Sequence, residues 1–338
     1  MARPRIAATR PCKQDLQRLI TLLDGHPLAL EVVLANLAKQ TPAQVLAALQ
    51  SGAGKLEINQ GTGDADQRTK AERTTSILAC IAYSHSNLSP ATQQLLLCLA
   101  PFTGVINRHW LPQYTAQLQA QPALAGLPYD RWDEVLDESI NWGLLTPDAQ
   151  LPTYLRIQPI FPYFLRTRLE EQATLLAAVE TAFRVHYDQI GDALQAAIQS
   201  KEPQARQIGL LFTKLEYENL SAALASALHG QTEFFNQYEA LFRYFLAQSA
   251  HDQAAQLSEK VLAVQSHYIL DKLSNNVAQH FLLVSDRAAH SYLMTQKYSQ
   301  AKQIYQNSLG YIGELQGVTE EFRATASASV YHQLGIVA

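Results

Sequence analysis

A glycine-rich stretch is the first place in this 338-residue chain where phosphate chemistry could occur. Gly52-Ala53-Gly54-Lys55 carries the closing glycine and lysine of a phosphate-binding loop, in which backbone N–H groups cradle phosphates and a hydroxyl binds magnesium. Leu49 stands where such a loop needs its first glycine, and Leu56 stands where it needs the Ser or Thr hydroxyl. We therefore expect a linker here and no nucleotide site.

Ser84-His85-Ser86 places a hydroxyl nucleophile beside a base. Adjacent side chains seldom point at each other, and the sequence offers no third group that would orient the histidine. We expect these residues to lie in a loop between two helices. The ten histidines of the chain show no spacing typical of a zinc site. The sequence therefore predicts neither a catalytic residue nor a metal ligand, and we expect no enzyme.

Composition indicates a globular chain. Hydrophobic residues make up 47% and charged residues 17%, and the net charge of -4 disfavours general binding to the phosphates of nucleic acid. Cys12, Cys80 and Cys98 are odd in number and far apart, which argues against a disulfide framework. No apolar run approaches the ~20 residues that span a bilayer. We expect a cytoplasmic protein with no membrane partner.

Two helix-capping motifs and one linker can be identified in the N-terminal part of the sequence. Thr41-Pro42 and Ser89-Pro90 each place a capping hydroxyl before a proline, which is typical of a first helical turn. Glycines among polar residues make 51–70 a flexible linker. Residues 1–50 are therefore expected to form a small helical piece of their own.

Residues 71–169 are predicted to form a winged helix with a small β-hairpin. Short extended runs at 144–146 and 154–157 flank a connection with two prolines, which is typical of a hairpin. A helix from Pro159 is expected to lead out. The helices before the hairpin are expected near 73–84, 90–100, 107–119 and 130–142.

The helix expected at 130–142 bears on DNA binding, because winged helices often read the major groove with their third helix and this segment takes that place. Residues 130–138 carry five acidic side chains against Arg131 alone, and phosphates would repel them. We expect a packing role for this domain, and a nucleic-acid partner is disfavoured. A transcription regulator that binds DNA through the winged helix is the alternative function.

Helical spacing continues without interruption from residue 170, and an internal repeat is visible. His251-Asp252-Gln253-Ala254 recurs as Tyr298-Ser299-Gln300-Ala301, 47 positions later. Repeats of this kind indicate stacked helical hairpins that bury their faces against each other. We expect a helical connector over 170–230 and helical repeats over 231–338. The predicted fold class is all-α: a helical bundle piece, a winged helix with a small β-hairpin, and an α-solenoid.

Three passages resemble, in family order, the NB-ARC or STAND signalling ATPases. Leu23-Asp24-Gly25-His26-Pro27-Leu28-Ala29-Leu30 is similar to the Gly-x-Pro-Leu-Ala motif of the helical ARC piece. Arg156-Ile157-Gln158-Pro159-Ile160 aligns with the Met-His-Asp motif at the end of the winged helix. Glu218-Asn219-Leu220-Ser221-Ala222-Ala223-Leu224 resembles the segment that often opens the helical sensor arm.

This resemblance implies the regulatory part of an ATPase whose P-loop domain lies elsewhere. The fragment would hold no cofactor alone, whereas its full-length parent would bind ADP or ATP. In the family, the proline that matches Pro27 packs on the adenine, and the histidine whose slot is Gln158 here contacts the β-phosphate. Glutamine donates a hydrogen bond without a positive charge. The nucleotide-binding domain of the parent is thus an expected partner, and we expect a piece of a longer protein.

The repeats also resemble tetratricopeptide repeats, whose first helices line a concave binding face. Ala289, Tyr292, Ala301 and Tyr305 match their small and aromatic positions. By this resemblance, a protein or peptide ligand would contact six residues in two equivalent sets, Glu239, Arg243 and Leu246, and Asp286, His290 and Leu293. The predicted function is the sensor portion of a STAND-type switch, in which ligand binding shifts a population between closed and open states.

Overall fold

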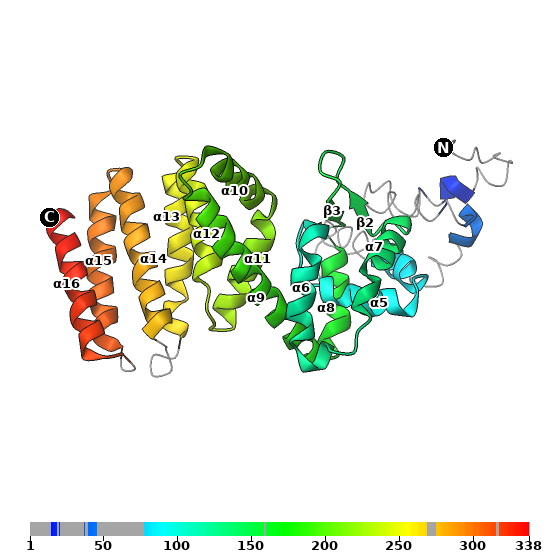
Figure 1. Ribbon diagram of the computed structural model, residues 1–338, viewed down its shortest axis with the longest axis horizontal. Coiled ribbons are helices and arrows are strands. Elements are labelled where there is room, and N and C mark those ends of the chain that lie inside the picture. The colour runs from blue at the N-terminus through cyan, green and yellow to red at the C-terminus, as the bar shows by residue number, and fades with distance from the viewer. Residues whose placement is uncertain are drawn as a thin grey trace, which may run out of the picture. The chain divides into compact units, whose positions relative to one another are not determined.

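The computed structural model describes residues 15–18, 20, 37, 40–45, 78–158, 160–268, 275–315 and 318–337. The protein is mainly α-helical with one small antiparallel sheet, which confirms the predicted fold class (Figure 1). It forms two compact units, Met1–Phe183 and Arg184–Ala338, and each is described by itself. Pro27, the predicted linker over 51–70 and Cys12 lie outside the described residues.

Helices form most of the described part of the first unit. Residues 78–86 are helical and are followed by α5 (Pro90–Leu96), α6 (Leu111–Gln119), α7 (Trp132–Asn141) and α8 (Phe161–Glu170). Short 3-10 turns extend α5 over Leu97–Leu99 and precede α7 over Tyr129–Arg131. The predicted capping residues act as caps, because Ser89 Oγ accepts the Thr92 N–H at 3.3 Å and Thr41 Oγ1 accepts the Gln44 N–H at 3.4 Å.

A three-stranded antiparallel sheet completes the first unit. It comprises β1 (Val105–Asn107), β2 (Leu145–Pro147) and β3 (Tyr154–Ile157) in the order β1-β3-β2. The predicted hairpin is present as β2 and β3, with Leu145 opposite Ile157. The sequence did not predict β1, whose Ile106 lies opposite Leu155. Three residues carry too little alternation to identify a strand without its partner.

The second unit is a succession of helices. It begins within α9 (Ala173–Ile198) and continues through α10 (Pro203–Leu215), α11 (Tyr217–His229), α12 (Phe235–Ala247), α13 (His251–Ala263), α14 (Asn275–Met294), α15 (Tyr298–Glu314) and α16 (Glu320–Val337). From α11 onward each helix packs against the next one in the chain, and Figure 1 shows α13 to α16 side by side. This is the solenoid-like arrangement that the repeat predicted.

The repeat is present in the backbone. The turns that end α12 and α14 each contain a residue in the left-handed region, Ser249 with φ 54° and Gln296 with φ 60°. In each turn the next N–H bonds back across the helix end, from Ala250 to Phe245 O at 2.9 Å and from Lys297 to Tyr292 O at 2.8 Å. The two turns thus have the same hydrogen-bonded form at the offset of 47 residues seen in the sequence.

Aromatic and small side chains form the core of the second unit. Phe234 and Phe281 lie with ring centroids 4.9 Å apart, and both are fully buried. A second cluster contains Ala289, Tyr292, Ala301 and Tyr305, which the sequence predicted as repeat positions, together with Ile312 and Val330. Their burial explains why small and aromatic residues recur there, since close helix packing needs a small residue opposite a large one.

Two further expectations concern membrane spans and cysteines. Within the described ranges, no helix is long and apolar enough to cross a membrane. Cys80 and Cys98 are buried, unbridged thiols, and burial raises the pKa of each to about 12. A thiol in such surroundings is a poor nucleophile, because the reactive form is the thiolate.

Candidate ligand-binding cavity in the helical repeats

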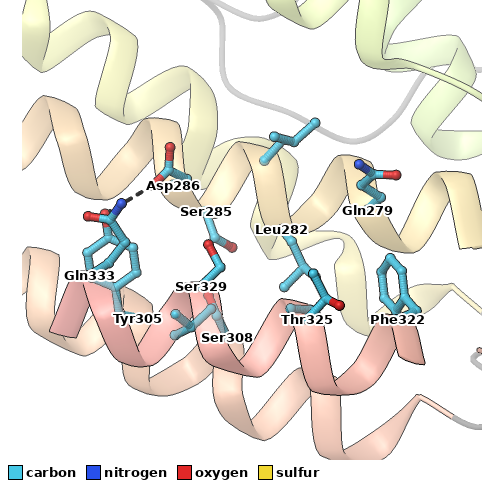
Figure 2. Close-up of a pocket in the computed structure, with 13 residues that line it drawn as sticks. Gln279, Leu282, Ser285, Asp286, Tyr305, Ser308, Phe322, Thr325, Ser329 and Gln333 are labelled. Atoms are coloured by element: carbon cyan, nitrogen blue, oxygen red, sulfur yellow. Dashed lines mark hydrogen bonds between the residues drawn. The ribbon is translucent and has the colours of Figure 1, made fainter. Parts of the chain in front are cut away.

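A cavity of about 330 Å³ lies among α14, α15 and α16 (Figure 2). Its volume is at the small end of the range typical of ligand pockets, roughly 300–1,000 Å³. Its walls combine hydroxyl, amide, carboxylate and apolar groups. The lining residues are Gln279, Leu282, Leu283, Ser285, Asp286, Tyr305, Ser308, Phe322, Thr325, Ala326, Ser329, Val330 and Gln333.

Helical spacing places these side chains in the cavity. On α14, Leu282, Ser285 and Asp286 are three and four residues apart, so they share one face. On α16, Phe322, Ala326, Ser329 and Gln333 follow one another at intervals of four, three and four residues, so they also share one face. Tyr305 and Ser308 of α15 are nearly fully buried and form the floor. The cavity therefore exists only when all three helices are packed together.

The polar end of the cavity centres on Asp286. The hydroxyl of Tyr305 donates a hydrogen bond to Asp286 Oδ1 at 3.2 Å. Burial and the neighbouring carboxylate both raise the pKa of Tyr305 above its usual value, so the phenol stays protonated and remains a donor. Arg287 Nη1 lies 3.6 Å from the other carboxylate oxygen. The Asp286 side chain is 40% exposed, so solvent and a ligand can both reach it.

Of the second predicted set of partner residues, the structure brings only Asp286 to the cavity. His290 lies on the exposed surface of α14. Leu293 is half-buried and packs against the core cluster of Ala289 and Tyr292. A role of His290 and Leu293 in partner binding stays a prediction.

The first predicted set is arranged differently from the expectation of a row of residues facing a groove. Glu239 is only 2% exposed, and Arg243 Nη2 lies 2.6 Å from its Oε1. Arg287 of α14 donates to both oxygens of Glu239 at 3.4 Å. Glu239 is therefore held inside the repeats by two arginines. A role of this set in partner binding stays a prediction. Leu246 is half-buried on the same helix.

Gln158 lies where the resemblance places it, between β3 and α8. It is buried, its N–H donates to Leu144 O at 3.4 Å, and its carbonyl accepts the Phe161 N–H at 2.8 Å. These contacts fix the backbone at the start of α8. Contact of Gln158 with a β-phosphate stays a prediction, as does contact of Pro27 with an adenine.

The segment Ser84-His85-Ser86 was predicted to be a loop, and this prediction is wrong. All three residues are helical, Ser84 and His85 are buried, and the His85 ring meets Phe164 edge-on with centroids 5.1 Å apart. Burial, and then the positive charge of Arg168, lower the pKa of His85 to about 4. The histidine is thus a neutral packing residue at pH 7. No cluster of three His, Cys, Asp or Glu side chains within the described ranges could hold a metal ion.

The acidic residues of α7 have two different roles. Glu138 bonds to the first turn of α5, accepting from Ser89 N at 2.8 Å. Asp137 pairs with Arg108 at 3.0 Å, whereas Asp133 is exposed. The exposed face of this helix therefore remains acidic, apart from Arg131, which pairs with Glu134 at 2.7 Å.

Sequence reasoning identified Asp286 but missed most of the cavity. The sequence predicted Tyr305 only as an aromatic position of the repeat. Ser308, Ser329 and Gln333 were not predicted as site residues. The available signal was the helical spacing of hydroxyl and amide residues on α16. Comparison of the chain with protein-family models, curated proteins and solved structures finds no match.

Proposed function

We propose that this protein is the non-catalytic, ligand-sensing portion of a STAND-type signalling switch in the cytoplasm. Its helical repeats bind a protein or peptide partner. The observation that carries this proposal is the cavity among α14, α15 and α16, which joins polar and apolar groups from three successive helices.

The cavity suits a sensor because its shape depends on helix packing. A ligand that contacts both α14 and α16 binds best at one particular distance between the two helices. Binding therefore shifts the population of conformations toward the one with that distance. Neighbouring hairpins of a solenoid contact only each other, and a small change between two of them alters the curvature of the array. Binding at Asp286 can thus be coupled to the remainder of the repeats.

The first unit is assigned to the switch itself as a winged-helix module. The order of its helices and strands, with β2 and β3 following α7, supports this assignment. Gln158 precedes the first turn of α8, and the N-terminal end of a helix favours anions. In this proposal ADP or ATP binds a nucleotide domain of the parent protein, with Pro27 against the adenine and Gln158 near the β-phosphate.

Peptide selection tests the binding function directly. A display library of random peptides is selected on the immobilised protein, and individual peptides are then measured by fluorescence anisotropy against two variants. Ser329→Trp fills the cavity from an exposed position on α16. Ala324→Trp adds the same bulk at an exposed position that does not line the cavity.

We expect selected peptides to bind the wild type and Ala324→Trp equally and to bind Ser329→Trp more weakly by about tenfold or more. Circular dichroism and melting temperature show that both variants fold. If no selected peptide distinguishes the two tryptophan variants, the cavity is not the binding site and the proposal fails.

A further inference from the structure

Three hydroxyl groups of the cavity wall, those of Ser285, Ser308 and Tyr305, donate their protons to other groups of the protein. Ser285 Oγ donates to Phe281 O at 3.1 Å, and Ser308 Oγ donates to Ile304 O at 2.9 Å. A hydroxyl that has donated its proton offers a ligand only its lone pairs. Tyr305 is likewise committed as a donor to Asp286. These groups therefore present acceptors to the cavity.

The charge of the cavity, like its acceptors, favours a cationic ligand. Among the residues that line it, within the described part of the chain, Asp286 is the one carboxylate, and none is Lys, Arg or His. Arg287, which approaches Asp286 at 3.6 Å, also donates to both oxygens of the buried Glu239. The positive charge of Arg287 is thus divided between two carboxylates, and Asp286 keeps a negative potential toward the cavity.

The apolar part of the wall lies beside the polar end. Figure 2 shows Asp286, Tyr305 and Gln333 at one end of the cavity and Phe322 at the other, with Leu282 between them. A ligand that fills this space has a donor-rich cationic tip and an apolar stem. Lysine side chains have this form, with a three-donor ammonium on four methylene groups that bury well against apolar surface.

We propose that the cavity binds a lysine side chain of the partner, with its ammonium at Asp286, Ser285 and Ser308 and its methylene stem along Leu282 toward Phe322. This inference rests on the proposed partner-binding function and specifies the chemistry of that partner. Three acceptors and one negative charge match an ammonium, which needs three acceptors and carries one positive charge. An anionic side chain at the same place would meet the like charge of Asp286.

The first test uses n-hexylammonium as the probe, with 1-hexanol and hexanoate as probes of the same stem length. Binding is followed by chemical-shift changes in two-dimensional NMR of the full chain. Hexylammonium is expected to bind saturably, and hexanol and hexanoate more weakly by about tenfold, because a charge-assisted hydrogen bond is worth roughly twice a neutral one. Equal binding of hexanol and hexylammonium overturns the proposal.

Three variants assign the effect to the cavity. Asp286→Asn keeps an oxygen that accepts from Tyr305 but removes the charge, and it should weaken hexylammonium binding about tenfold. Gln333→Glu places a carboxylate of nearly the same shape as the glutamine at the polar end and should strengthen hexylammonium binding. A purely structural role of this end would not produce such a gain. Asp133→Asn removes an equal charge from an exposed site in the first unit and should change nothing.

Peptides selected on the wild type separate this inference from the binding function. Each should contain a lysine whose replacement by norleucine, which keeps the stem, weakens binding about tenfold. Selected peptides that bind in the cavity with unchanged affinity after this replacement would refute the lysine assignment while the binding function stands. Hexylammonium binding without any cavity-dependent peptide would refute the binding function instead.

Discussion

Glu138 and Ser89 join α7 to the beginning of α5, although 49 residues separate them in the chain. Glu138 Oε1 accepts the Ser89 N–H at 2.8 Å, and Oε2 accepts the Ser89 hydroxyl at 3.0 Å and also the hydroxyl of Thr92. The carboxylate thereby satisfies donors at a helix N-terminus, where the backbone dipole also favours a negative charge. It acts as a cap supplied by a distant helix.

Removal of this cap should destabilise the first unit. Glu138→Ala leaves the donors of Ser89 and Thr92 without their acceptor, and we expect the free energy of unfolding to fall by about 2–3 kcal/mol. Urea denaturation followed by circular dichroism measures it. Asp133→Ala, at an exposed position of the same helix, should change stability by less than about 0.5 kcal/mol. Equal effects of the two substitutions would show that the cap contributes nothing.

The left-handed turns of the repeats should accept glycine with a gain in stability. Ser249 has φ 54° and Gln296 has φ 60°, a conformation that glycine adopts without the steric cost of a Cβ atom. Ser249→Gly and Gln296→Gly should each raise the free energy of unfolding by about 0.5–1 kcal/mol. Gln306→Gly, within α15, should lower it by about 1 kcal/mol. Thermal melts that rank the three variants otherwise would contradict this account.

Acid should destabilise the first unit through His85. Its pKa is lowered from 6.5 to about 4, so between these values the unfolded chain binds a proton that the folded chain does not bind. The stability from neutral His85 is complete above pH 6.5 and falls by up to about 1.4 kcal/mol per pH unit as pH drops toward 4. His85→Phe should reduce this slope in urea melts at several pH values.

Comparison at pH 8 isolates the packing effect of the substitution, because His85 is neutral there in both states. An unchanged slope between pH 6.5 and pH 4 in His85→Phe would mean that other groups cause the acid sensitivity.

The protein should not bind duplex DNA at physiological salt, and this result would argue against the transcription-regulator alternative. The exposed face of α7 presents Asp133, Glu134 and Asp137. Glu134 and Asp137 pair with arginines, so these arginines are not free to bind phosphate, and Asp133 repels it. Anisotropy titration with a labelled random-sequence duplex should show no binding at micromolar protein, and Asp133→Lys with Glu134→Lys should introduce weak binding. Sub-micromolar binding by the wild type that weakens steeply with added salt would restore the alternative.

Local signals in the sequence located the helices and the repeat, whereas pairings between distant residues were not predictable. Ser89-Pro90 identified the start of α5, since a hydroxyl cap and a proline act within one turn. Glu239 was expected to face a groove, because its helix position matched that of Asp286. Its buried carboxylate pairs with Arg243 of its own helix and with Arg287, and the second pairing spans 48 residues and has no local signature. Likewise β1 becomes a strand only through its pairing with β3.

The ion pairs of Glu239 have a consequence for how the repeats unfold. This carboxylate, 2% exposed, is held by Arg243 of its own helix and by Arg287 of the following hairpin. If the later hairpin detached alone, it would remove one of the two cations that compensate a buried negative charge. Local unfolding that starts at the C-terminal end therefore costs additional electrostatic free energy once it includes α14, because Glu239 then loses Arg287. We expect α12 to α15 to melt as one cooperative block, and hydrogen exchange should give their slowest amides a common opening free energy.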